Sequence, residues 1–150
     1  MHKLLYIDDE KHNLTTLKLS VKKWYEVFTL ENPLEVLELI ERENIGVVIT
    51  DQRMPRMSGL ELAEQIKEKF EDVIVIILTA YDDSNVMLKA INQGGIFRYM
   101  LKPWDIKDLQ QTLSNAFETW ELRIKNRQLV NNLLIQNQEL SIQERKYRLI

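Results

Sequence analysis

Short apolar runs alternate with segments of helical periodicity along about the first 115 residues. Runs of strand length lie at residues 4–7, 27–30, 47–50, 73–78 and 99–101. The third and fourth are apolar without alternation, which is typical of parallel strands covered by helices on both faces. Helical patterns lie between them, near residues 11–23, 33–43, 59–69, 84–93 and from 105 onward. This alternation predicts an α/β fold with a parallel sheet.

Two of the predicted helices begin at recognisable capping residues. Ser58 is followed by Glu61, which predicts a capping box at the start of the third helix, and Asp105 is suited to cap the fifth. Helical spacing also predicts core-facing stripes. These consist of Leu14, Leu17 and Val21 in the first helix, and of Leu60, Ala63, Ile66 and Lys67 in the third.

Residues 121–150 follow a different pattern, without Gly or Pro. Every third or fourth residue lies on one seam, and about six of the nine seam positions are apolar, which predicts an imperfect coiled coil. The seam consists of Leu122, Asn126, Leu129, Leu133, Gln136, Leu140, Gln143, Tyr147 and Ile150. Asn126 is a polar seam residue of the kind that fixes register. We expect a helical linker that can pair in a homodimer; the alternative is a solitary, partly frayed helix.

Length, composition and charge narrow the class of protein. A chain of 150 residues accommodates one domain, expected over residues 1–120, plus the linker. Hydrophobic content of 45% and charged content of 29% are ordinary for a soluble globular protein. The 20 Lys and Arg against 23 Asp and Glu give a net charge of −3, which argues against direct binding to nucleic acid or an anionic membrane.

The chain has no cysteine, so disulfides and thiolate metal sites are excluded. The first apolar run, residues 4–7, ends at the charged residue Asp8, so it is too short for a signal peptide or a membrane span. We therefore expect a cytoplasmic protein. His2 and His12 are isolated from each other, and we interpret them as surface or helix residues rather than metal ligands.

Acidic residues follow two of the predicted strands. Asp8-Asp9-Glu10 come after the first strand and Asp51 after the third. An acidic run alone is more often a solvated loop, but ligands bind beyond the carboxyl ends of strands in a doubly wound sheet, where these groups would converge. Crowded carboxylates repel one another unless a cation lies among them. A hard divalent ion is expected, most simply Mg²⁺, with Mn²⁺ as the alternative.

Two further strand ends carry a hydroxyl and an ammonium group. Thr79 follows the fourth strand and Lys102 the fifth. Each alone would be interpreted as a turn residue or a surface charge. Together with the acidic groups they suit phosphoryl transfer to a carboxylate. Asp51 would be the nucleophile, Lys102 and the metal would neutralise the phosphoryl oxygens, and Thr79 would donate a hydrogen bond.

This arrangement closely resembles the receiver domain of response regulators in two-component signalling, over roughly residues 2–120. The matching motifs are the acidic pair Asp8-Asp9, the phosphoacceptor Asp51 with its loop Met54-Pro55 to Gly59, the switch hydroxyl Thr79, and Lys102-Pro103. The resemblance implies a flavodoxin-like, doubly wound five-stranded sheet of order 2-1-3-4-5 with helices on both faces, extended by a C-terminal helix.

The resemblance also implies roles for individual residues. The metal would be bound by the Asp9 and Asp51 side chains and the Arg53 backbone carbonyl, with Asp8 acting through water. Tyr99 matches the aromatic switch residue that responds to Thr79. The partner would be a histidine kinase or phosphotransfer protein, and the domain would promote only its own Mg²⁺-dependent phosphorylation and dephosphorylation.

Other positions leave questions open. Arg53 and Tyr81 occupy positions that tune phosphoryl lifetime in the family. Trp104 either faces a partner or packs on the fifth helix, and a homodimer could form through that helix or through the tail. Residues 143–150 resemble the lead-in helix of a PAS domain, which suggests an output module beyond them.

Two other function classes compete with a phosphorylated receiver. A pseudo-receiver would act as a protein-interaction module without phosphorylation, but no acidic, hydroxyl or lysine residue is missing. A hydrolase with an aspartyl-phosphate intermediate needs an acid/base carboxylate shortly after its nucleophile, where this chain has Arg53.

Overall fold

The structure is a computed structural model that describes residues 1–80, 82 and 84–148. Tyr81 and Ile150, both singled out from the sequence, lie outside the described residues, as does the side chain of Tyr147. By their internal contacts, Met1–Trp120 and Glu121–Ile150 form two compact units.

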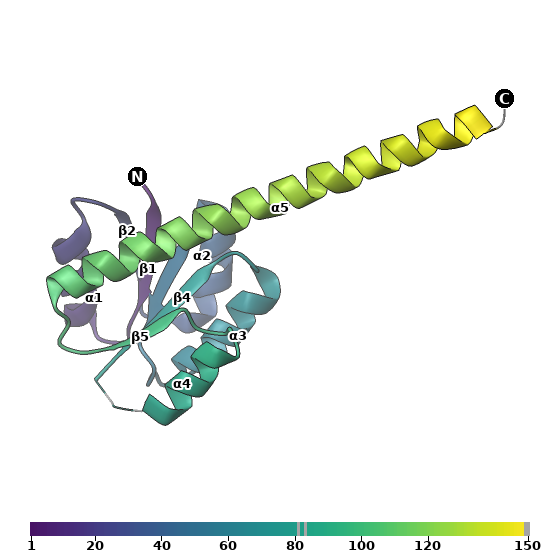
Figure 1. Cartoon of the computed structure of the whole chain (residues 1–150). Helices are drawn as coiled ribbons and strands as arrows, with labels where there is room; N and C mark the ends of the chain where they lie inside the picture. Colours follow the sequence, from purple (N-terminus) through teal and green to yellow (C-terminus); the bar gives the residue numbers. More distant parts are fainter. Residues whose placement is uncertain (81, 83, 149–150) are drawn as a thin grey trace. The chain divides into compact units, whose positions relative to one another are not determined.

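A five-stranded parallel sheet of order β2-β1-β3-β4-β5 forms the centre of the first unit (Figure 1). Its strands are β1 (Lys3–Ile7), β2 (Glu26–Leu30), β3 (Val47–Thr50), β4 (Ile74–Thr79) and β5 (Arg98–Leu101). The helices are α1 (Lys11–Val21), α2 (Val36–Glu43), α3 (Gly59–Lys69), α4 (Ser84–Asn92) and α5 (Ile106–Arg148), and a 3₁₀ turn, η1 (Pro33–Glu35), precedes α2. This confirms the predicted flavodoxin-like fold and its long C-terminal helix.

Helices cover both faces of the sheet, and each face has its own apolar core. Side chains alternate along β1, so Leu4 and Tyr6 belong to one core and Leu5 and Ile7 to the other. The first core is closed by α1 and α5 through Leu14, Leu17, Val21, Leu109, Leu113 and Phe117. The second is closed by α2, α3 and α4 through Val36, Leu39, Ile40, Leu62, Ala63, Ile66 and Met87.

The ends of α3 and α5 agree with the capping predictions, but the stripe predicted for α3 was partly wrong. The Ser58 hydroxyl accepts the Glu61 backbone N–H at 3.1 Å, and Asp105 accepts that of Lys107 at 3.0 Å. In α3, however, Leu60 is only half-buried and Lys67 is exposed. The buried face follows the helical spacing from Gly59 instead and consists of Gly59, Leu62, Ala63 and Ile66.

Aromatic rings cluster where the amino end of β1 meets α5 within the first unit. His2 stacks on Phe117 with ring centroids 4.6 Å apart, and Tyr25 stacks on the same ring at 5.0 Å. Trp120 meets Phe117 edge-on at 6.3 Å. The Trp120 ring also lies over Gly46, where a Cβ atom would stand 2.7 Å from ring atom Cδ2. Glycine is therefore required at residue 46 for this ring to pack.

We expect Gly46→Ala to lower the free energy of unfolding by about 1–3 kcal/mol, the usual cost of overpacking a tight contact. The cause is the ring of Trp120, so the same substitution should cost far less in a Trp120→Ala background. Urea denaturation of the four proteins in this double-mutant cycle measures both values. Equal costs in the two backgrounds would contradict the assignment of the clash to Trp120.

Candidate functional site

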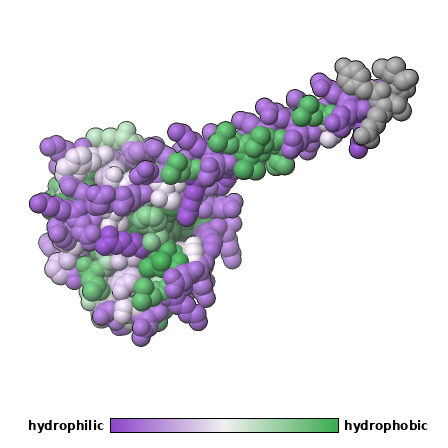
Figure 2. All heavy atoms as spheres, in the orientation of Figure 1, coloured by the Kyte–Doolittle hydropathy of each residue, from purple (hydrophilic) through white to green (hydrophobic). Residues whose placement is uncertain are grey.

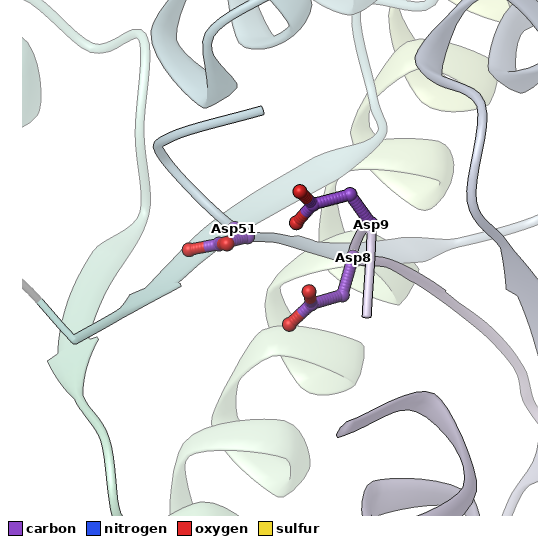
Figure 3. A group of neighbouring side chains, drawn as sticks. All are labelled: Asp8, Asp9 and Asp51. Atoms are coloured by element: carbon purple, nitrogen blue, oxygen red, sulfur yellow. The ribbon is translucent and has the colours of Figure 1, made fainter. Parts of the chain in front are cut away.

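The site forms where β1 and β3 end side by side. Ile7 pairs with Thr50 in the parallel register, so Asp8-Asp9 and Asp51 leave the sheet at the same edge. The Asp51 backbone N–H donates to the Ile7 carbonyl at 2.9 Å. Carboxylate oxygens of the three aspartates lie within 4.8 Å of one another. Figure 3 shows their side chains pointing to the same side of the strand ends.

Asp8 is buried and has hydrogen bonds on both carboxylate oxygens. Oδ2 accepts from Lys102 Nζ at 2.7 Å, from the Tyr6 hydroxyl at 2.7 Å and from Asn13 Nδ2 at 3.1 Å. Oδ1 accepts the Glu10 backbone N–H at 3.0 Å. Burial alone would raise the pKa of Asp8, but the bonds from Lys102, Glu10 and Tyr6 outweigh it and hold the pKa below its usual value. Asp8 is therefore a fixed anion.

Asp51 is nearly as buried as Asp8, with 8% of its surface exposed, but it is less well compensated. Its Oδ1 accepts the Gln52 backbone N–H at 2.9 Å, and Lys102 Nζ lies 3.8 Å from its Oδ2. Burial raises the pKa of Asp51 to about 6, with Lys102 opposing the rise and Asp8 adding to it. The pKa of the exposed Asp9 is also raised, by partial desolvation and by Asp8.

Lys102 joins the fifth strand to the acidic cluster. Its ammonium lies between Asp8 and Asp51, and its backbone N–H donates to the Thr79 carbonyl at 2.8 Å. Thr79 is the last residue of β4 and is fully buried. The structure thus brings Asp8, Asp9, Asp51 and Lys102 together, with Thr79 at the adjoining strand end.

The loop after Asp51 is closed by Gln52 and Gly59. The Gly59 backbone N–H donates to the Gln52 carbonyl at 2.9 Å, and the Gln52 side chain accepts the Leu60 N–H at 3.0 Å. A Cβ atom on Gly59 would stand 2.6 Å from the Asp51 carbonyl oxygen, so any larger residue would displace the backbone at Asp51. Arg53 lies in this loop with its side chain exposed.

Tyr99 and Trp104 lie beside the site, each partly buried. Tyr99, in β5, packs against the second core, and Trp104 packs against the first core, to which α5 contributes. Both line a surface groove of about 550 Å³ that also includes Ile91 and Asp108. Trp104 thus packs on the domain and also lines its surface.

His12 is exposed, in agreement with its interpretation as a surface residue.

The acidic cluster has the chemistry of a site for a hard divalent cation. It offers three carboxylates within mutual reach, and the pKa of two of them, Asp9 and Asp51, is raised first by burial and further by the negative charge of Asp8. Oxygen ligands of this kind suit Mg²⁺. The residues present therefore fit the predicted metal.

Comparison with known proteins agrees with this geometry. A family model described as "Response regulator receiver domain" matches residues 4–114. The chain belongs to the response regulator receiver domain family. Figure 1 shows the arrangement of sheet and helices that it shares with receiver domains of known structure.

Two solved receiver domains illustrate the similarity. A receiver domain protein from Clostridium thermocellum has a TM-score of 0.75 and 34% identity, covering 81% of this chain and 98% of the other. The response regulator TrrA from Thermotoga maritima, solved in complex with Mg²⁺-BeF, has a TM-score of 0.69 and 32% identity over 77% of this chain and 99% of the other.

Two curated relatives are longer transcriptional regulators. The hydrogenase transcriptional regulatory protein HoxA of Cupriavidus necator is 30% identical over 80% of this chain, and the transcriptional regulatory protein GlrR of Escherichia coli is 35% identical over 77%. The receiver chain spans about a quarter of the length of these proteins, 25% and 26% respectively.

Three polar residues that contact the site were not predicted from the sequence. Tyr6 and Asn13 both donate to Asp8, and Gln52 fixes the loop after Asp51. Tyr6 lies in an apolar strand, where an aromatic residue is expected to fill the core. The available signal was its alternation with Asp8, since residues two apart in a strand face the same side.

Proposed function

We propose that this receiver domain accepts a phosphoryl group on Asp51 from a histidine kinase or a phosphotransfer protein, in the cytoplasm, and relays a conformational change to an output module. The observation that carries this proposal is the ammonium of Lys102 between two buried carboxylates, 2.7 Å from Asp8 and 3.8 Å from Asp51. Asp8 holds the lysine in place, and Asp51, whose charge is less well compensated, would act as the nucleophile.

In the proposed reaction an Asp51 carboxylate oxygen forms the new O–P bond while the P–N bond to the donor imidazole breaks. The Gln52 N–H orients the Asp51 carboxylate through Oδ1. Lys102 stabilises negative charge on the transferring phosphoryl oxygens. Asp8, Asp9, Asp51 and the Arg53 carbonyl would hold Mg²⁺, which, when bound, supplies further neutralisation of that charge.

The conformational relay would use the ends of β4 and β5. Thr79 would turn its hydroxyl toward the phosphoryl group, and Tyr99 would then move further into the second core, against which it already packs. The groove lined by Tyr99 and Trp104 would change shape as a result. This is a two-state element biased by one covalent group.

Intact-mass spectrometry with acetyl phosphate and Mg²⁺ tests the proposal. We expect one labile phosphoryl adduct on the wild type, no adduct in EDTA and no adduct on Asp51→Asn. Circular dichroism of the variant establishes that it is folded. An adduct that persists in the variant, or none on folded wild type, would contradict the proposal and favour the pseudo-receiver.

We further propose that residues 121–148 pair two copies of the chain. Leu122, Leu129, Leu133 and Leu140 lie within about 40° of one another around the helix axis, and each is more than half exposed. Figure 2 shows the apolar side chains along this helix in green. The alternative, pairing through the receiver itself, is supported by the beryllofluoride-activated NtrC4 receiver domain, which is described as a dimer and has 26% identity and a TM-score of 0.74 over 80% of this chain.

A matched pair of substitutions separates this seam from the rest of the helix. Leu133→Lys is expected to weaken dimerisation at least about tenfold, because two leucine side chains would lose their apolar burial. Ile135 is about as exposed as Leu133 but lies off the seam, so Ile135→Lys should leave the dimer intact. Sedimentation equilibrium measures both. A dimer insensitive to Leu133→Lys would instead favour pairing through the face of the fifth helix within the receiver.

A further inference from the structure

Tyr6 connects the first core to the acidic site. Its side chain is fully buried in that core, while its hydroxyl lies 2.7 Å from Oδ2 of Asp8. Burial and the hydrogen bond to Asp8 raise the pKa of Tyr6, so it acts here as a neutral donor. The proposed reaction gives this hydroxyl no role, although it bonds directly to a carboxylate of the site.

Three donors share one oxygen of Asp8. Tyr6 and Lys102 each approach Oδ2 to 2.7 Å, and Asn13 approaches it to 3.1 Å. A carboxylate oxygen has two lone-pair positions, so donors on the same oxygen compete for its charge. The bond from Tyr6 therefore weakens the attraction that Asp8 exerts on Lys102.

The position of Lys102 matters because the same ammonium must serve Asp51. Lys102 Nζ is 2.7 Å from Asp8 but 3.8 Å from Asp51. To contact a phosphoryl group on Asp51, the ammonium has to loosen its bond to Asp8. A buried carboxylate left without donors would resist that movement, since an unpaired buried charge is costly. Tyr6 and Asn13 remain as donors when Lys102 shifts.

We propose that Tyr6 is a positioning residue, which shares the charge of Asp8 so that Lys102 is released toward Asp51 and Asp8 attracts the divalent cation less strongly. This inference rests on the proposed function, since it concerns the availability of Lys102 for the phosphoryl group. It predicts that loss of the Tyr6 hydroxyl strengthens Mg²⁺ binding but slows phosphorylation. A role in packing alone would not move these two quantities in opposite directions.

Tyr6→Phe removes the hydroxyl and keeps the buried ring. We expect Mg²⁺, titrated by calorimetry, to bind several-fold more tightly, because Asp8 loses a donor that offsets its charge. We expect phosphorylation by acetyl phosphate at saturating Mg²⁺ to slow by about tenfold, in keeping with the strength of hydrogen bonds to charged groups. Tyr25→Phe is the matched control, since Tyr25 packs against the same core. It should match the wild type in both measurements.

Unchanged Mg²⁺ affinity in Tyr6→Phe would overturn the inference, and so would a loss of Mg²⁺ affinity together with a lower unfolding temperature, which indicates packing alone. The calorimetric result is independent of phosphorylation. If the wild type takes up no phosphoryl group, the proposed function fails, while tighter Mg²⁺ binding by Tyr6→Phe would still support the action of Tyr6 on Asp8.

Discussion

Lys102→Met is expected to slow phosphorylation of Asp51 by about 10²–10³-fold, the range found when a preorganised group that stabilises transition-state charge is removed. The Lys102 side chain is partly buried, with 15% of it exposed, and its ammonium lies near both carboxylates, so solvent would not replace it well. The rate of adduct formation with acetyl phosphate and saturating Mg²⁺ measures the effect. Methionine retains most of the length of the side chain without its charge.

Lys107→Met provides the control for this substitution. Lys107 is exposed in the first turn of α5, where its backbone N–H donates to Asp105 at 3.0 Å, so loss of its ammonium should not change the rate. A slowing of less than about tenfold in folded Lys102→Met would mean that this lysine does not supply the charge stabilisation expected of it.

Asp51→Asn is expected to stabilise the metal-free protein at neutral pH. Burial raises the pKa of Asp51 to about 6 from 3.8, so the folded state holds its proton more tightly than the unfolded state. The stability linked to that proton is fully present below pH 3.8 and is lost as the pH rises through about 6. Above pH 6 the ionised group costs roughly 2–3 kcal/mol of stability, which asparagine would remove.

Urea denaturation in EDTA at pH 4 and at pH 7.5 measures this difference. The gain in Asp51→Asn should appear at pH 7.5 and nearly vanish at pH 4, and added Mg²⁺ should stabilise the wild type more than the variant. Glu64→Gln removes an exposed carboxylate of α3 and should give no comparable gain. Equal free energies of unfolding for the wild type and Asp51→Asn at both pH values would show that burial of the ionised Asp51 carboxylate does not destabilise the protein.

The fold could be predicted well because its signals are local. The apolar runs at residues 47–50 and 73–78 were nearly coincident with β3 and β4, and the caps at Ser58 and Asp105 marked the starts of α3 and α5. The error in α3 arose because Leu60 is apolar but lies one position away from the buried face set by Gly59. Hydrophobicity alone does not show that the buried face includes Gly59 rather than its apolar neighbour Leu60.

The acidic cluster and Lys102 could be expected from their places at strand ends, because parallel strands end at one edge of a sheet. The contact of Tyr6 with Asp8 was missed although its signal is local, because the two residues stand two apart and face the same side of the strand. The contact of His2 could not be predicted, because His2 stacks on Phe117, which is more than a hundred residues away in sequence. The roles of Thr79, Tyr99 and Arg53 remain predictions.

No helix within residues 1–80, 82 and 84–148 combines the length and apolar character needed to cross a membrane. Polar residues occur throughout the long α5 helix, and four of the five leucines in residues 121–148 lie on one seam, with Leu134 off it. That pattern is typical of a helix that pairs with another helix. Its part in relaying a signal is a proposal that the Leu133→Lys and Ile135→Lys pair addresses.

Locating the phosphoryl group tests the central claim most directly. Phosphorylated protein is reduced with borohydride, which converts an aspartyl phosphate to homoserine, and is then digested with trypsin. Cleavage after Arg42 and Arg53 isolates Asp51 in one peptide, whereas Asp8 and Asp9 lie in the peptide of residues 4–11. We predict homoserine at residue 51 alone. Homoserine at residue 8 or 9, or none in protein whose intact mass carries the phosphoryl group, would contradict the assignment of Asp51 as the phosphoacceptor.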